Sequence, residues 1–322
     1  MKINQIIALG SALIFLTGIF FVTGCKQNEG QKSKKPRIAL IMKSLANEFF
    51  QTMENGAKEH QRQHQDEYEL IANGIKDELD VSRQIDLVEQ MVSQRVDAIV
   101  IAPADSKALV PVCKKAQQAG IVVINIDNKF DDEVLAQNGV KFPFVGPNNR
   151  TGAKKVAEYA AKRLKPGDNV VIIEGAPNAF NAIQRKLGFQ DAITEGKLNL
   201  VSSQSGYWET DKANKVASAI ITEHPDIKAI FCANDSMAIG VVAALRDAGK
   251  LGKVLVAGYD NISAAQQLLK EGKIIATADQ HADKLAVYGI EYAIKILKEK
   301  IVPNDFETPV DLITSETLAG GK

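Results

Sequence analysis

The chain has 322 residues, and its 39 acidic and 39 basic side chains give a formal net charge of zero at neutral pH. Proteins that bind nucleic acid rely on an excess of basic side chains to neutralise phosphates, so this balance argues against that class. With only three cysteines in the sequence, a small scaffold held together by disulfide bonds is excluded as well.

The amino terminus carries the pattern of an export signal. A short basic start precedes an apolar run from Ile6 to Val22, a combination typical of a secretory signal. The residues that end this run, Val22 to Cys25, resemble the lipobox of bacterial lipoproteins, whose cysteine is lipidated. The resemblance predicts a signal peptide over residues 1–24 and a lipid on Cys25. An ordinary transmembrane anchor stays open as the alternative.

Residues 25–35 are polar and contain glycine and lysine without apolar periodicity. Such a segment buries no core, so we expect a flexible tether that leads to a folded part beginning near Pro36. Residues 36–322 are more than one hydrophobic core normally serves, which predicts two domains.

Beyond the tether, short β-branched runs alternate with amphipathic stretches of helical length. The alternating strands and helices, starting with a strand, are predicted at 38–42, 49–64, 69–72, 81–94, 98–101, 107–118, 121–124, 151–164, 170–173 and 182–195. The strands are continuously apolar, as parallel strands covered on both faces require. The pattern therefore predicts an α/β fold with two successive doubly wound parallel sheets.

The loops that follow several predicted strands are polar and aromatic. They comprise residues 43–50, 127–128, 234–235 and 260–261. In doubly wound sheets, ligands bind at the carboxyl ends of the strands. These loops are therefore the first candidates for a binding site, although Asp235 is expected to have a structural role.

The sequence lacks the common catalytic signatures. It contains no G-x-x-x-x-G-K loop, no G-x-S-x-G elbow, no H-E-x-x-H pair and no EF-hand loop. His60 and His64 have the spacing of a metal pair, but no Glu lies between them and a solvated helix face is the better interpretation. Cys113 and Cys232 lie in apolar segments and are expected to be buried thiols. We therefore predict no catalytic residue, no metal and no cofactor.

Six segments, taken in order, resemble the type I periplasmic sugar-binding proteins of the ribose-binding family, which are also similar to the effector domain of lactose-repressor-type regulators. The segments are 38–50, 102–105, 124–127, 185–189, 231–240 and 256–260. The resemblance implies two doubly wound domains joined by a hinge of three crossovers, near Gly146, Gln280 and Pro309. One domain would comprise residues 36–146 and 281–309, and the other residues 147–280 and 310–322.

The resemblance also implies a sugar site between the domains. A pyranose has apolar C–H faces and a rim of hydroxyls, which call for aromatic walls and planar polar side chains. Matching positions for the walls are Phe49, Phe50 and Trp208. Matching positions for the rim are Asn47, Asp127, Arg185, Asn234, Asp260 and Gln280. Asn47 also stands where the N-cap of the following helix belongs.

Three positions depart from the ribose-type pattern. The ribose-type site has a small hydroxyl residue where Lys43 stands and an arginine where Asn128 stands, and Glu48 replaces the usual proline. Lys43 and residues 230–235 are closer to the D-allose-binding branch, which favours a hexopyranose over ribose, whereas Asn128 matches neither branch. We include Lys43 and Asn128 among the predicted ligand-binding residues.

The function implied by the resemblance is that of the extracytoplasmic solute-binding component of an ABC importer. The protein would bind a monosaccharide such as allose or ribose, close around it, and present it to the permease subunits as a lipid-anchored monomer. A sugar-sensing module for a chemoreceptor or histidine kinase stays open, as does a binder of a polyol or a furanosyl signal. A transcriptional regulator is disfavoured because a signal and a lipobox precede Pro36. A sugar hydrolase would require two carboxylates facing one bond, for which Asp127 and Asp260 are the candidates.

Overall fold

The computed structural model describes residues 35–320. The predicted signal peptide, the predicted lipidation site Cys25 and all but the last residue of the predicted tether lie outside them. Between residues 35 and 320, no helix combines the length and the apolar character needed to cross a membrane.

The first lobe is built on a parallel sheet with the strand order β11-β5-β4-β3-β1-β2. Its strands are β1 (Arg37–Ser44), β2 (Glu69–Ile75), β3 (Ala98–Ile101), β4 (Val122–Ile126), β5 (Phe144–Pro147) and β11 (Phe306–Thr308). Strand β1 shows why continuous apolar runs form such a sheet. Ile38 and Leu40 join the core on one face, whereas Ala39 and Ile41 join the core on the other.

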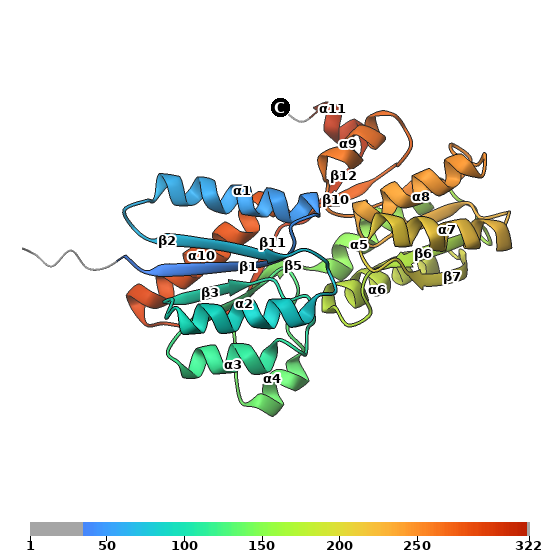
Figure 1. The fold of residues 1–322 in the computed structure, drawn as a ribbon. Coiled ribbons are helices and arrows are strands. Elements are labelled where there is room, and N and C mark those ends of the chain that lie inside the picture. Colours follow the sequence, from blue (N-terminus) through green and yellow to red (C-terminus); the bar gives the residue numbers. More distant parts are fainter. Residues whose placement is uncertain (1–34, 321–322) are drawn as a thin grey trace, which may run out of the picture. The chain divides into compact units, whose positions relative to one another are not determined.

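Helices cover both faces of this sheet (Figure 1). One face carries α1 (Glu48–Gln63) and α10 (Ala282–Glu299), which pack against each other. The other face carries α2 (Val81–Ser93) and α3 (Val110–Gln118), with α4 (Asp132–Asn138) beside α3.

The second lobe has a parallel sheet with the order β7-β6-β8-β9. Its strands are β6 (Asn169–Glu174), β7 (Asn199–Ser205), β8 (Ala229–Cys232) and β9 (Leu255–Ala257). The helix pair α5 (Asn149–Ala161) and α6 (Phe180–Glu195) packs together, as does the pair α7 (Thr210–Glu223) and α8 (Asp235–Asp247). Next to this sheet lie α9 (Ser263–Lys270), the antiparallel strands β10 (Thr277–Asp279) and β12 (Asp311–Ile313), and α11 (Ser315–Gly320).

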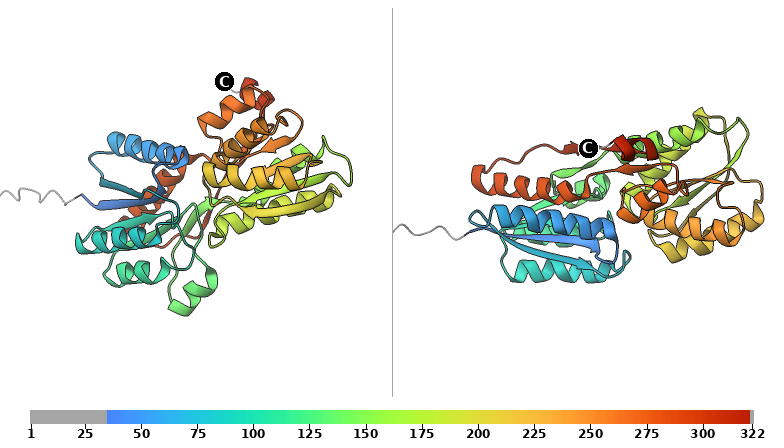
Figure 2. Two further views of the ribbon diagram at one scale, coloured as in Figure 1. Left: turned by 45° about the vertical axis from the view of Figure 1, so that its right-hand side comes forward. Right: turned by 90° about the horizontal axis from the view of Figure 1, so that it is seen from above.

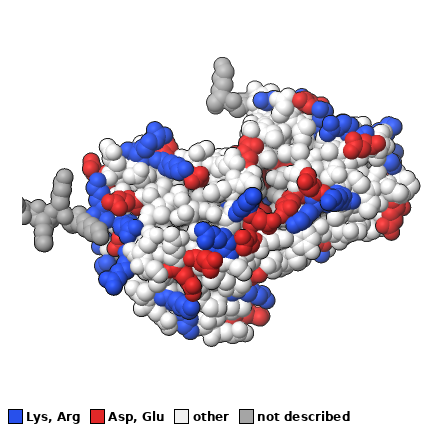
Figure 3. Space-filling model, in the orientation of Figure 1, with Lys and Arg blue, Asp and Glu red and all other residues white. Residues whose placement is uncertain are grey.

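The chain passes between the lobes three times (Figure 2). It leaves the first sheet after β5, returns after β10 to form α10, and leaves again between β11 and β12. The prediction of an α/β fold with two parallel-sheet domains is thereby confirmed. On the face drawn in Figure 3, acidic and basic side chains are interspersed, as expected for a chain with zero net charge.

Candidate ligand-binding site

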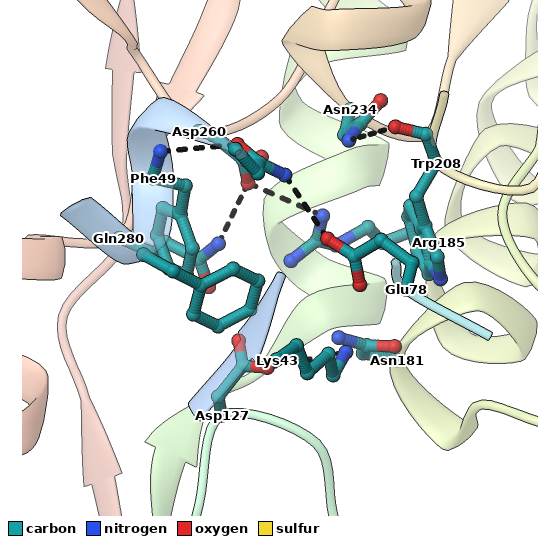
Figure 4. A pocket seen from close by; sticks show the side chains of 12 residues that line it. Lys43, Phe49, Glu78, Asp127, Asn181, Arg185, Trp208, Asn234, Asp260 and Gln280 are labelled. Atoms are coloured by element: carbon teal, nitrogen blue, oxygen red, sulfur yellow. Dashed lines mark hydrogen bonds and ion pairs between the residues drawn. The ribbon is translucent and has the colours of Figure 1, made fainter. Parts of the chain in front are cut away.

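A small cavity lies where the carboxyl ends of strands from both lobes meet. Figure 4 shows the side chains that line it. They are Lys43, Asn47, Phe49, Phe50, Glu78, Asp127, Asn181, Arg185, Trp208, Asn234, Asp260 and Gln280. The structure thus brings together every predicted ligand-binding residue except Asn128.

Aromatic rings from both lobes form the apolar part of the lining. Phe49 and Phe50 open α1 and meet edge to face, with 5.1 Å between their ring centroids. Trp208 follows β7 in the second lobe and is buried. A Cβ atom on Gly175 would lie 2.2 Å from Trp208 Cη2, so only glycine lets the indole pack against this segment. The two lobes therefore each supply a flat apolar wall.

Asn47 has both roles that the sequence suggested. As the N-cap of α1 it accepts a hydrogen bond from Phe49 N through Oδ1, at 3.0 Å. Its Nδ2 donates to Glu78 Oε1 at 3.2 Å, and the side chain lines the cavity. The cap therefore orients Asn47 without removing it from the site.

Arg185 is held from several directions. Its Nε donates to Asn149 Oδ1 at 2.7 Å, and Nη1 donates to Ala233 O at 2.8 Å. The guanidinium carbon lies 3.8 Å from the centroid of the Tyr259 ring, a cation–π contact. Only 2% of the Arg185 side chain is exposed. The guanidinium is therefore fixed in place, as a residue that must orient a ligand requires.

Asp260 connects Arg185 to Gln280. Its Oδ1 accepts hydrogen bonds from Arg185 Nη1 at 3.3 Å and from Gln280 Nε2 at 2.7 Å. Burial raises the pKa of Asp260, and the charge of Arg185 opposes that shift. Its backbone has φ 118°, while Asp127 and Trp208 have φ 62° and 69°. Because such angles are strained for residues other than glycine and gather at functional sites, they mark this cavity as functional.

Lys43 and Asp127 form a second buried pair of opposite charges. Lys43 Nζ lies 3.4 Å from Asp127 Oδ2, and the two side chains are 3% and 2% exposed. Lys43 Nζ also lies 5.8 Å from the Phe50 ring centroid and 5.6 Å from that of Trp208. Two cations and three carboxylates therefore face the cavity, and this mixture suits a neutral polar ligand better than a strongly charged one.

Three acceptor atoms at the cavity receive no hydrogen bond from any residue between 35 and 320. They are Asp127 Oδ2, Asn181 Oδ1 and Gln280 Oε1. The charge of Asp127 Oδ2 is offset by Lys43 Nζ at 3.4 Å. Asn181 Oδ1 and Gln280 Oε1 have no such partner, and a buried acceptor without a donor costs about 1–3 kcal/mol of free energy, because buried polar groups in folded proteins are nearly always paired. A ligand with several hydroxyl donors would satisfy all three atoms.

Glu78 and Asn181 line the cavity but were not predicted. Glu78 lies between β2 and α2, so the rule that ligands bind after strand ends covers it as well. Asn181 lies one helical turn before Arg185 on α6, and residues four apart share a helix face. Both signals were available in the sequence.

Asn128 is the predicted ligand-binding residue that the structure places outside the cavity lining. Its side chain is fully buried and does not line the cavity. Its Nδ2 donates to Pro103 O at 2.8 Å, while Oδ1 accepts from Asn181 N at 3.1 Å. The short side chain is thus engaged with protein groups on both of its polar atoms.

Other predictions concern residues outside the cavity. Asp235 is structural, because its carboxylate accepts from Thr277 Oγ1 and Ile262 N. Cys113 and Cys232 are buried free thiols, as expected.

His60 is not a solvated side chain, since it is 13% exposed and bonds to the hydroxyl of Tyr68. Within residues 35–320, no group of three or more His, Cys, Asp or Glu residues is arranged to hold a metal ion.

Glu78 makes the stability of the protein depend on pH. Burial raises the pKa of Glu78 to about 7, while Lys43 and the hydrogen bond from Asn47 oppose the shift. The folded state binds the proton on Glu78 more tightly than the unfolded state does. The contribution of this proton to stability is therefore fully present below the pKa that Glu78 has in the unfolded chain, and it is lost as the pH rises toward 7. Glu78→Gln mimics the protonated form. Between pH 5.5 and 8, the free energy of unfolding of Glu78→Gln should therefore fall by about 1–3 kcal/mol less than that of the unmodified chain. Urea unfolding at both pH values tests this, and equal changes for Glu78→Gln and the unmodified chain would disprove it.

Comparisons with known proteins give consistent matches. A family model described as a periplasmic binding protein domain matches residues 38–301. A D-ribose/D-allose-binding protein of Pseudomonas aeruginosa is 58% identical over 286 residues, which cover 88% of this chain and 90% of that protein.

Solved structures agree with the sequence match. An ABC transporter solute-binding protein from Burkholderia multivorans, with an unknown ligand, has a TM-score of 0.86 and 58% identity over 88% of this chain and 100% of that one. A periplasmic solute-binding protein from Actinobacillus succinogenes, with bound D-allose, has a TM-score of 0.84 and 39% identity over 89% of this chain and 100% of that one.

Proposed function

Because the chain belongs to the family of periplasmic binding protein domains, we propose that it is the extracytoplasmic solute-binding component of an ABC importer and that it binds a monosaccharide. The named relatives make D-allose and D-ribose the first candidates. The observation that carries the proposal is the cavity with aromatic walls and three buried acceptors that receive no hydrogen bond from residues 35–320, of which Asp127 Oδ2 is ion-paired with Lys43.

The chemistry of the cavity favours a neutral polyhydroxyl ligand. Phe50 and Trp208 offer ring faces and edges to the C–H groups of a sugar. Asp127, Asn181 and Gln280 each offer an acceptor to a hydroxyl donor. A phosphate or carboxylate ligand brings acceptors only and would face the carboxylates of Glu78, Asp127 and Asp260. Such anions are therefore disfavoured.

Closure of the two lobes around the sugar follows from the composition of the site. Asp127 belongs to the first lobe and Arg185 to the second, so a ligand that contacts both stabilises the closed arrangement. We place the two domains at residues 36–146 with 281–309 and at 147–280 with 310–322. The permease would recognise the closed form of a monomer.

Glu48 adds a direct contact between the lobes. Its Oε1 accepts a hydrogen bond from Ser263 N, the first residue of α9, at 2.7 Å. The N-cap of that helix, Ile262, makes no side-chain cap. Glu48 thus caps a helix of the opposite lobe, where a carboxylate interacts favourably with the helix dipole.

Replacing Glu48 should weaken sugar binding although Glu48 does not line the cavity. We expect Glu48→Ala to raise the dissociation constant about 2- to 30-fold, because about 0.5–2 kcal/mol of closed-state stabilisation is lost. Calorimetric titration checks this, with Glu89→Ala on the exposed surface of α2 as the control. Unchanged affinity in Glu48→Ala would contradict the role of this cap.

Attachment to the membrane rests on the sequence pattern at Cys25. We propose that Cys25 carries the lipid and that the protein faces the periplasm or the cell exterior. In Cys25→Ser the protein should move from the membrane fraction to the soluble fraction, because one or more acyl chains no longer anchor it. Fractionation with detection of the protein measures this, and retention of Cys25→Ser in the membrane would favour a transmembrane anchor instead.

A thermal-shift screen tests the proposed function. A ligand that binds only the folded state raises the apparent melting temperature. We expect D-allose or D-ribose to raise it, and we expect the sugar to be recovered unchanged, since the proposal is binding without turnover. A rise with anionic ligands and none with neutral sugars or polyols would refute the proposed ligand class.

A further inference from the structure

Helix α6 begins in the second lobe, and groups of the first lobe cap it. Its N-cap residue, Ala179, has no side chain that accepts a hydrogen bond. Instead, Phe180 N donates to Ser106 Oγ at 2.9 Å, and Asn181 N donates to Asn128 Oδ1 at 3.1 Å. Ser106 and Asn128 lie in loops after β3 and β4. The start of α6 is therefore fixed by the opposite lobe.

The capping groups are themselves held firmly. Asn128 Nδ2 donates to Pro103 O at 2.8 Å, and Asn125 Nδ2 donates to Asn128 O at 2.8 Å. Ser106 Oγ donates to Asn128 Oδ1 at 3.3 Å, and Ser106 N donates to Asn178 O at 3.2 Å. All of these groups except Asn178 are buried. The amide of Asn128 thus has a defined orientation, and the hydrogen bond that it accepts from Asn181 N fixes the first turn of α6 relative to it.

Asn181 is the residue that this contact places. Its side chain is 3% exposed and lines the cavity (Figure 4). Its Oδ1 receives no hydrogen bond from the part of the chain that the structure describes. Because its backbone N–H is bonded to Asn128, the position of its Oδ1 depends on the contact between the lobes. A sugar hydroxyl is the donor that would satisfy it.

We propose that Asn181 is a ligand-binding residue that accepts a hydrogen bond from a sugar hydroxyl, and that Asn128 is the positioning residue that sets this acceptor when the lobes close. The inference rests on the proposed function. Asn128, where the ribose-type pattern has an arginine, would then affect specificity indirectly. It would do so by placing Asn181, without itself contacting the sugar. A site that pairs with a particular hydroxyl rejects analogues that lack it.

The test combines variants with deoxy sugars. In Asn181→Leu, which has a similar size and no acceptor, we expect the dissociation constant for D-allose or D-ribose to rise about 10- to 100-fold. One monodeoxy analogue of the sugar that binds lacks the hydroxyl bound by Asn181. This analogue should bind the unmodified protein more weakly than the parent sugar does. It should bind Asn181→Leu as tightly as the parent sugar does. This loss of additivity would not arise from a merely structural role.

Asn128→Ala tests the positioning role. We expect weaker binding and a smaller difference between the parent sugar and that same deoxy analogue. Ile183→Ser, on α6 but 46% exposed, should leave both affinities unchanged. Should Asn128→Ala fail to fold, Asn128→Ser replaces it, and the Asn181→Leu data decide the ligand contact by themselves.

The outcomes separate the two proposals. If the unmodified protein binds no neutral sugar or polyol, D-allose, D-ribose and their deoxy analogues included, the proposed ligand class and this inference both fail. If the unmodified protein binds sugar and Asn181→Leu binds all analogues with unchanged affinity, the inference is overturned and the proposed function stands.

Discussion

Asp260→Ala should raise the dissociation constant for the sugar about 100-fold or more. Asp260 Oδ1 accepts from both Arg185 and Gln280, so its removal leaves a buried guanidinium without its carboxylate and releases the Gln280 amide. Breaking a buried pair of this kind lowers folding stability by about 3–5 kcal/mol. At a binding interface, truncating one partner of such a pair costs about 2–5 kcal/mol of affinity, and a loss of about 3 kcal/mol corresponds to a factor of about 100 or more. Calorimetric titration with D-allose and D-ribose measures the change.

The control for this prediction is Asp247→Ala, because Asp247 is exposed at the end of α8. Asp260→Asn separates charge from shape, since an asparagine keeps one acceptor and nearly the same size. We expect Asp260→Asn to bind more tightly than Asp260→Ala and more weakly than the unmodified chain. Affinity of Asp260→Ala within threefold of the unmodified chain would contradict the structure of the site described above.

Trp208→Ala should weaken binding about 30-fold or more and should also lower stability. Trp208 is buried against Gly175 at the wall of the cavity, and a central tryptophan commonly contributes about 2 kcal/mol or more to binding. Tyr207→Ala is a matched control, because Tyr207 is the adjacent aromatic residue, is 38% exposed and does not line the cavity.

The same wall can be tested without touching the indole. Gly175→Ala places a methyl group where the Trp208 ring lies, so it should displace the ring and reduce affinity in the same direction as Trp208→Ala. Since Trp208 is the only tryptophan of the chain, its intrinsic fluorescence reports the ring environment directly. A sugar-induced fluorescence change of equal size in the unmodified protein and in Gly175→Ala, with equal affinities, would show that the ring does not form the wall.

The fold could be predicted because its signals are local. The β1 residues Ile38 to Met42 are buried on both faces of the sheet, and such strands must be apolar throughout. Much of the site could be predicted for a related reason, since Asp127, Asn234 and Asp260 each follow a strand at the carboxyl end of a sheet. Chain topology alone brings these loops together.

The differences between the predicted site and the cavity lining concern the direction of side chains. Asp127 and Asn128 are neighbours in the sequence, yet only Asp127 lines the cavity, while Asn128 bonds to Pro103 and to α6. Adjacency in a loop does not determine which of two side chains faces a ligand. Glu78 and Asn181 could have been found from their positions, Glu78 after β2 and Asn181 one helical turn before Arg185, but the contacts with Asn47 and Asn128 that orient them join distant segments.

The most direct test of the central claim is a crystal structure of the protein with D-allose or D-ribose. We expect the sugar in the cavity between Phe50 and Trp208, with hydroxyl groups donating to Asp127 Oδ2, Asn181 Oδ1 and Gln280 Oε1. A sugar bound elsewhere, or one whose hydroxyls leave all three acceptors without a donor, would contradict it.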